Sequence, residues 1–395
     1  MASIQSESQA DALLLLTNTP PSSFQALKTA YSPILATILS ELSASVNRTD
    51  KTAVLEIAIA IGGLPEVKRP YSHLQQLIAS FYRLLGTVSS SLSVELDTPG
   101  GVDARLFFLV CDSTTIEHLS YGPIIDIRSL ASSKRRWNTV FTLDTEEGHG
   151  LARNLFDGST PQPKDIRFLP SVPNSPANCA VNNDELSTPS YSVVVGGTFD
   201  HLHAGHKLLL TATALALDAR TSPSPLGRRI LTIGITGDEL LVNKKYAEFL
   251  ESWETRWKGV WDFFQSILVF SSPDQKDIRF EHQSKPGPNG NRVIVTVSPD
   301  LELRFVQIAD PFGPTITDEE IMALVVSEET RSGGAAVNGE RAKKGWQTLE
   351  VFEVGVLEAG DDGQQDQTTA SQNFESKISS TEIRRRRMNL AKGNL

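Results

Sequence analysis

The chain reads Gly-Gly-Thr-Phe-Asp-His-Leu-His-Ala-Gly-His from residue 196 to residue 206, and this stretch decides the fold of the second half. The apolar run 191–195 before it predicts a strand, and residues 205–220 have helical spacing. Paired glycines let a backbone approach a phosphate closely, while a helix N-terminus presents unpaired N–H groups and a positive dipole end. The pattern therefore predicts a nucleotide-handling turn between a strand and a helix.

Three of the seven histidines lie in this stretch. His203 and His206 are three residues apart, so they share a face if the helix starts that early. No cysteine or paired carboxylate lies nearby in the sequence, so we expect no resident metal at this point. In the first half of the chain, the scattered His73, His118 and His149 are expected to be surface or structural residues.

Composition excludes several classes of protein. The length of 395 residues suits two domains, and a formal net charge of −10 argues against nucleic-acid binding. Two distant cysteines, Cys111 and Cys179, suggest neither a disulfide framework nor a cysteine zinc site. We find no signal or transit peptide and no apolar run of membrane length. We therefore expect a cytoplasmic protein without a membrane partner.

The pattern along the chain predicts three parts. Residues 1–155 alternate helical and strand-like segments, which predicts an α/β domain of unknown fold and role. Residues 156–190 are rich in Pro, Asn and Ser and are expected to be a linker. Residues 191–395 alternate strands and helices, which predicts an α/β fold with a doubly wound parallel sheet and a ligand at the carboxyl ends of its strands. We expect this last part to fold and act without residues 1–185.

Hydrophobic periodicity also predicts individual elements. In the first part we expect helices over 23–46 and 72–85, an apolar run over 53–61, and strands over 92–96, 104–111, 124–127 and 139–143. In the last part we expect strands over 191–195, 230–236, 267–270, 303–308, 322–326 and 349–357, and helices over 205–220, 238–243, 249–264 and 381–390. Residues 271–299 and 359–376 are polar insertions, the first with a hairpin tip at 286–290.

A second phosphate-type element lies near the end of the chain. Residues 377–384 read Lys-Ile-Ser-Ser-Thr-Glu-Ile-Arg, so three hydroxyls open the expected helix and Arg384 lies in its first turn. Hydroxyls, free N–H groups and a guanidinium together suit a polyphosphate. Ser379 with Glu382 is also a simple capping box, which would explain the residues without any ligand. There is no Walker, Gly-x-Gly-x-x-Gly or Gly-x-Ser-x-Gly motif.

Together the two elements resemble the HxGH nucleotidyltransferases, and in particular the eukaryotic form of the phosphopantetheine adenylyltransferase family. The resemblance covers about residues 191–393 and implies a Rossmann-like fold. It includes Asp-Pro-Phe-Gly-Pro at 310–314 and Val-Val-Ser-Glu-Glu-Thr at 325–330, followed by Gly333, Gly334 and Asn338. This last block is more discriminating than the histidine motif, which cytidylyltransferases and nicotinamide-mononucleotide adenylyltransferases also carry.

The resemblance implies transfer of an adenylyl group from ATP to 4′-phosphopantetheine, giving dephospho-coenzyme A and pyrophosphate. The attacking phosphate has a second pKa of about 6, so the enzyme must align two anions rather than supply a strong base. Mg²⁺ is expected on the pyrophosphate oxygens. Other coenzyme A biosynthetic enzymes are possible partners through residues 1–155. Because no P-loop follows, we expect the chain to perform only this adenylyl transfer.

The family's roles transfer to matching residues of this chain. His206 would hydrogen-bond the α-phosphate in the transition state, and Thr198 would orient the attacking phosphate. Lys244 matches the catalytic lysine, with Lys245 beside it as the alternative. Arg331 is shifted by one position from the family's arginine, which leaves its role open. The implied nucleotide-binding residues are Gly196, Gly197, His203, Ser379, Ser380, Thr381 and Arg384.

Two other functions are weighed against this one. A cytidylyltransferase acting on a phosphoalcohol usually has a signature near Arg-Thr-x-Gly-Ile-Ser-Thr, which residues 377–384 lack. A non-catalytic nucleotide-binding scaffold of the coenzyme A pathway would have no chemical reason to keep all the residues above. Both alternatives can be tested with substrates.

Overall fold

The computed structural model describes thirteen ranges of the chain: 11–17, 20–21, 23–46, 50–61, 71–110, 121–133, 135–156, 161–170, 189–218, 228–270, 278–285, 289–355 and 379–392. Both cysteines, His118, the hairpin tip at 286–288 and the polar insertion at 359–376 lie outside these ranges. The chain forms two compact units, each described by itself below. Unit 1 comprises Met1–Val67, Ser80–Asn182 and Asp262–Gln275, and unit 2 comprises Lys68–Ala79, Asn183–Trp261 and Lys276–Leu395.

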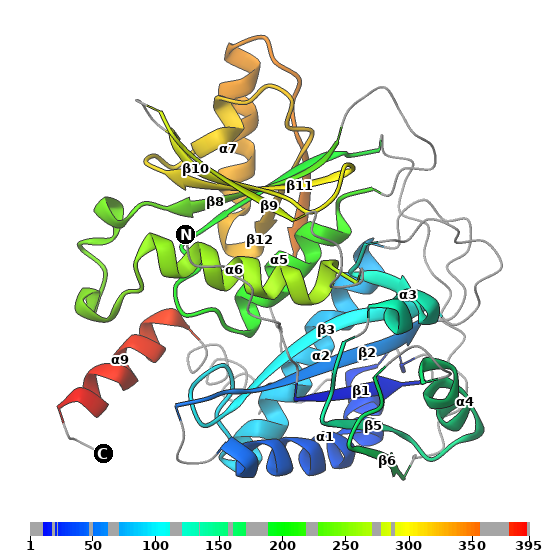
Figure 1. Ribbon diagram of the computed structural model, residues 1–395. Helices are drawn as coiled ribbons and strands as arrows, with labels where there is room; N and C mark the ends of the chain where they lie inside the picture. Colours follow the sequence, from blue (N-terminus) through cyan, green and yellow to red (C-terminus); the bar gives the residue numbers. More distant parts are fainter. Residues whose placement is uncertain are drawn as a thin grey trace. The chain divides into compact units, whose positions relative to one another are not determined.

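Unit 1 contains a six-stranded, all-parallel sheet of order β4-β3-β2-β1-β5-β6 (Figure 1). Its strands are β1 Ala12–Leu16, β2 Ala53–Ile61, β3 Val102–Val110, β4 Ile124–Asp126, β5 Thr139–Leu143 and β6 Asp165–Leu169. The helices that begin among them are α1 Phe24–Val46, α2 Tyr71–Leu92, α3 Ile127–Ser132 and α4 Glu146–Leu155. The strand order reverses between β1 and β5, which makes the sheet doubly wound.

The central strand β1 is an unbroken apolar run that is buried at every residue. Leu14 pairs with Ile57 of β2 on one side and Phe141 of β5 on the other. A continuous apolar run is typical of a parallel strand covered on both faces. Neither β1 nor β6 is predicted from the sequence, because the run of β1 is too short to show a period and β6 lies inside the range expected to be a linker.

A buried polar network stabilises unit 1. Glu56 of β2 is 1% exposed; its carboxylate pairs with Arg135 at 2.6 Å and accepts a hydrogen bond from the indole N–H of Trp137 at 2.8 Å. Arg135 also donates to the carbonyl of Val269 at 2.8 Å, and its guanidinium lies 4.1 Å from the ring centre of Phe270. Phe270 is 2% exposed and belongs to the hydrophobic core of this unit. Residues 262–275 are therefore structural parts of unit 1.

Unit 2 contains a seven-stranded sheet of order β13-β12-β7-β8-β11-β10-β9. Its strands are β7 Ser192–Gly197, β8 Arg229–Thr236, β9 Arg279–Ser284, β10 Asn291–Thr296, β11 Leu301–Ile308, β12 Ala323–Ser327 and β13 Glu350–Val354. Five strands are parallel, and β9 and β10 add an antiparallel hairpin beside β11. The strand order reverses between β7 and β12, so this sheet is also doubly wound, as the sequence predicts.

Helices cover both faces of the unit 2 sheet, and Figure 1 shows α7 on the opposite side from α5 and α6. The α-helices are α5 Ala204–Leu215, α6 Trp253–Leu268, α7 Arg331–Lys343 and α9 Ser380–Ala391. Short 3₁₀ helices are η1 Asp238–Leu241, η2 Ala247–Phe249, η3 Gly313–Ile316 and η4 Glu328–Thr330. No helix in the described ranges is long and apolar enough to cross a bilayer.

Several expected elements are wrong. The strand expected at 267–270 is the end of α6, whose buried residues Val260, Phe264 and Ile267 continue at helical spacing. The strand expected at 92–96 does not form, because α2 runs to Leu92 and only Leu96 makes an isolated bridge. Of the helix expected at 238–243, only η1 is helical.

Candidate active site

The stretch 196–206 lies at the carboxyl edge of the unit 2 sheet, where the strand order reverses between β7 and β12. Ligands of doubly wound sheets bind at such a point. His203 is the N-cap residue of α5, yet its side chain makes no capping hydrogen bond. The first N–H groups of α5 are therefore open to a ligand, and the helix dipole favours an anion there.

Two glycines of this stretch, Gly197 and Gly205, are closely packed against neighbouring rings. A Cβ atom at Gly205 would lie 3.3 Å from the imidazole of His203, and one at Gly197 would lie 2.9 Å from the ring of Phe199, which is 1% exposed. The rings of His203 and His206 stack with centres 3.9 Å apart, which confirms that the two histidines share a face. Nothing lies within 4 Å of a Cβ placed on Gly196, which leaves open space at the strand end.

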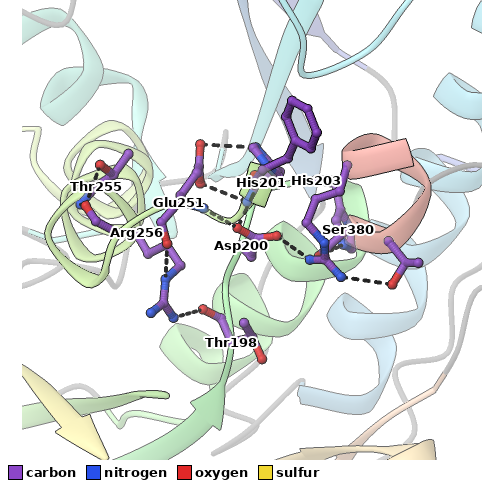
Figure 2. Close-up of polar contacts among 12 residues, drawn as sticks. Thr198, Asp200, His201, His203, Glu251, Thr255, Arg256 and Ser380 are labelled. Carbon is purple, nitrogen blue, oxygen red and sulfur yellow. Dashed lines mark hydrogen bonds and ion pairs between the residues drawn. The ribbon is translucent and has the colours of Figure 1, made fainter. Parts of the chain in front are cut away.

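The N-terminus of α9 lies beside that of α5. The hydroxyl of Ser380 is 3.4 Å from Nε2 of His203 (Figure 2). Ser379 caps α9, because its hydroxyl accepts the N–H of Glu382 at 3.3 Å, whereas the Glu382 carboxylate pairs with Arg385 and Arg386, so only the serine half of the expected capping box is observed. Two helix N-termini thus converge on one point together with the two histidines. The arrangement is electrostatically suited to a multiply charged anion.

Arg384 holds α9 in place. Its side chain is 3% exposed and pairs with Asp200 at 2.5 Å. It also donates to the carbonyl of Lys245 at 3.0 Å and to the hydroxyl of Thr381 at 3.1 Å. The guanidinium expected to bind phosphates therefore has protein acceptors in this structure. Binding a triphosphate would require it to exchange partners.

Asp200, His201 and Glu251 bring ligand atoms within 4.8 Å of one another, so the expectation that no paired carboxylate lies near the histidines is wrong. Glu251 lies just before α6, far from the histidine stretch in the sequence. Its position beside that stretch could therefore not be predicted from the local pattern. The three groups do not fit a resident metal, because they are bonded to one another. Nδ1 of the His201 ring lies 3.2 Å from the Glu251 carboxylate, and Nε2 lies 2.8 Å from the carbonyl of Phe249. The Glu251 carboxylate also accepts the backbone N–H of His201 at 2.8 Å, and Asp200 accepts the backbone N–H of Glu251 at 2.9 Å and pairs with Arg384.

Residues 1–170 match a domain of unknown function (DUF8446). An uncharacterized protein of Schizosaccharomyces pombe, C1F12.08, is 31% identical over 280 residues, which are 71% of this chain and 73% of that protein. A phosphopantetheine adenylyltransferase of Saccharomyces cerevisiae is 36% identical over 191 residues, 48% of this chain and about half (47%) of the yeast protein.

An archaeal relative decides the family. The phosphopantetheine adenylyltransferase of Pyrobaculum aerophilum is 32% identical over 170 residues, which are 43% of this chain and 82% of that protein. About half of this chain belongs to the phosphopantetheine adenylyltransferase family. The motifs on which the sequence resembles that family all lie between residues 191 and 393.

The other residues to which the resemblance gives a role, Lys244, Lys245 and Arg331, are more exposed to solvent. Lys244 and Lys245 are both exposed in the turn between η1 and η2, and the backbone carbonyl of Lys245 accepts a hydrogen bond from Arg384 of α9. The choice between the two lysines therefore stays open. Arg331 begins α7 and forms a two-pronged ion pair with Glu353 of β13. This contact gives Arg331 a structural partner away from the histidines.

The two histidines of the adenylyltransferase motif are neutral at physiological pH. Burial lowers the pKa of His206 to about 4, although Glu251 acts in the opposite direction. Burial also lowers the pKa of His203 well below its usual value, and His206 and Lys207 add to that effect. A neutral imidazole carries one N–H donor. Each ring can therefore donate one hydrogen bond to a bound phosphate.

These low pKa values predict that stability falls in mild acid. Between pH 6.5 and about 4 the unfolded chain binds a proton at His206 that the folded chain does not, and the lowered pKa of His203 acts in the same direction. Stability is therefore full above pH 6.5 and decreases as pH falls. For His206 alone the loss at pH 5 is on the order of 2 kcal/mol. Urea unfolding at pH 7.5, 6 and 5 measures it. In the double variant His203→Gln, His206→Gln the free energy of unfolding should depend less on pH. An equally steep decrease in the variant would contradict the conclusion that these two histidines cause the loss of stability.

Proposed function

We propose that the protein transfers an adenylyl group from ATP to 4′-phosphopantetheine, producing dephospho-coenzyme A and pyrophosphate in coenzyme A biosynthesis. The identity to named phosphopantetheine adenylyltransferases supports the substrates. The observation that carries the proposal is the uncapped N-terminus of α5, with two stacked neutral histidines and the start of α9 beside it. Such a site can hold a nucleotide's phosphates without a resident metal.

The reaction forms one bond and breaks one. A phosphate oxygen of 4′-phosphopantetheine attacks the α-phosphorus of ATP, and the bond from that phosphorus to the oxygen bridging to the β-phosphate breaks. The electron pair leaves with pyrophosphate. No proton has to be removed from the attacking group, because the phosphate is largely dianionic at neutral pH. The protein's task is to align two anions and to donate hydrogen bonds where charge builds up.

Each residue at the strand end has a role suited to its position. The hydroxyl of Thr198 has no hydrogen-bond partner in the described ranges and orients the attacking phosphate. His206 donates to the α-phosphate, and an exposed lysine of the 244–245 pair swings onto the same phosphate. The open backbone at Gly196 and Gly197 permits close approach of the nucleotide. The β- and γ-phosphates lie between the start of α5, with His203, and that of α9, with Ser380 and Thr381.

Mg²⁺ enters this scheme as part of the MgATP substrate. It neutralises charge on the leaving pyrophosphate and usually keeps several waters, so it does not require a dedicated protein cage. The carboxylates nearest the histidines are already bonded to protein donors. The protein itself contributes hydrogen-bond donors at the starts of α5 and α9.

Pyrophosphate release tests the function directly. With MgATP and 4′-phosphopantetheine, the purified full chain should release pyrophosphate only when both substrates are present. Parallel mixtures replace ATP with CTP, and 4′-phosphopantetheine with phosphocholine or glycerol 3-phosphate. Release with CTP and a phosphoalcohol alone would identify a cytidylyltransferase instead. Nucleotide binding without release in any mixture would favour a scaffold.

A further inference from the structure

A single fully buried arginine lies beneath the proposed site. Arg256, in the first turns of α6, has a side chain with no exposed surface. Its guanidinium donates to the carbonyl of Thr198 at 2.7 Å, to the carbonyl of Thr236 at 2.8 Å and to the carbonyl of Glu251 at 3.0 Å. It also pairs with Asp238 at 2.5 Å. Figure 2 shows Arg256 reaching Thr198. Thr198 and Thr236 mark the carboxyl ends of β7 and β8.

The contacts of Arg256 join the histidine stretch to the segments that precede the lysine turn and α6, and α9 is linked to them indirectly through Asp200. Thr198 belongs to the histidine stretch, and Asp238 begins the 3₁₀ helix before the lysine turn. Glu251 bonds both Asp200 and His201, and Asp200 in turn pairs with Arg384 of α9. The planar guanidinium presents five donors in a fixed geometry, which a lysine cannot reproduce. One side chain therefore sets the spacing between segments that are far apart in the sequence.

We propose that Arg256 is a positioning residue, which fixes the main chain of Thr198 so that the Thr198 hydroxyl meets the attacking phosphate. The inference rests on the proposed function. Arg256 does not touch the substrate in this scheme, because its side chain is completely buried. It acts through Thr198, and a shift of about 1 Å in a positioned group can cost about a hundredfold in rate.

A second buried arginine provides a matched control. Arg341 of α7 is also fully buried and donates to the carbonyls of Thr315, Asp318 and Gln347, among others. It holds η3 and the segment after it, and its hydrogen bonds in the described ranges include none to the histidine stretch. Arg256→Lys and Arg341→Lys make the same chemical change in equally buried surroundings. Only the first should alter the geometry at Thr198.

The experiment compares the two variants in the full chain. Arg256→Lys should lower kcat for pyrophosphate release about a hundredfold with little change in the KM for ATP, since α5 and α9 bind the triphosphate. Both substitutions should lower Tm by a similar amount. Arg341→Lys, however, should leave kcat within about twofold of the wild-type value. An unchanged kcat in Arg256→Lys, or equal losses of kcat in both variants, would overturn the inference.

Hydrogen exchange separates this inference from the proposed function. Arg256→Lys should accelerate amide exchange over 196–203, whereas Arg341→Lys should accelerate it over 313–321. If the wild-type chain releases no pyrophosphate, the proposed function fails, and the role for Arg256 in that reaction fails with it. If the wild type is active and exchange at 196–203 is unchanged in Arg256→Lys, only the inference fails. If Arg256→Lys does not fold, Asp238→Asn is the alternative variant. It removes one exposed partner of the Arg256 guanidinium and should also lower kcat.

Discussion

Replacing His206 with alanine is expected to lower kcat for pyrophosphate release about a hundredfold or more, while the chain stays folded. The imidazole lies against His203 at the start of α5, where the α-phosphate of ATP would be held. Because burial lowers the pKa of this ring to about 4, the ring is neutral at physiological pH and has one N–H to donate to the phosphate. Removing a donor that acts mainly in the transition state lowers kcat more than it raises the KM for ATP.

The fold should tolerate this substitution because Nδ1 of His206 is buried without a hydrogen-bond partner in the described part of the chain. Deleting the ring removes an unsatisfied polar atom, which offsets part of the packing lost. His149→Ala is the matched control, because His149 is 44% exposed and pairs with Asp144 in unit 1. That variant should keep wild-type kcat. Unchanged turnover by His206→Ala at saturating ATP and 4′-phosphopantetheine would refute the role of His206.

The parts of the site that could be predicted from sequence are those set by local geometry. The three-residue spacing of His203 and His206 places both rings at one helix terminus, and the strand before Gly196 places them at the carboxyl edge of a sheet. The glycine at position 205 leaves room for the His203 ring. Each of these inferences needs only neighbouring residues and the periods of a helix or strand.

The contacts that could not be predicted from sequence join residues that are far apart in the chain. Arg256 reaches Thr198 across 58 positions, and Arg384 reaches Asp200 across 184. Nothing in the spacing of a charged residue on an amphipathic helix predicts that its head group is buried. For the same reason Arg384 was expected to meet a ligand, whereas the structure gives it Asp200. The composition-based domain boundaries also omit the exchange of segments between the two units.

A fragment of residues 186–395 is expected not to fold stably, contrary to what its composition predicts. The fragment carries residues 262–275, which belong to unit 1. In the full chain Phe270 packs against Phe107 with ring centres 5.0 Å apart, and Gly122 donates to the carbonyl of Leu268 at 3.1 Å. Arg135 donates to the carbonyl of Val269. Truncation removes all three partners and leaves the end of α6 and an apolar ring without cover.

The magnitude of this loss decides the expected outcome. Phe270→Ala in the full chain should cost about 3–5 kcal/mol, as for other buried phenylalanines. A whole domain is usually stable by only about 5–15 kcal/mol. The fragment lacks the residues that pack against both the end of α6 and the Phe270 ring. We therefore expect it to show no cooperative unfolding in urea. Adding residues 1–185 as a separate chain should restore both the transition and pyrophosphate release, because it supplies the missing partners. If the fragment alone unfolded cooperatively with wild-type kcat, residues 262–275 would be dispensable to the fold.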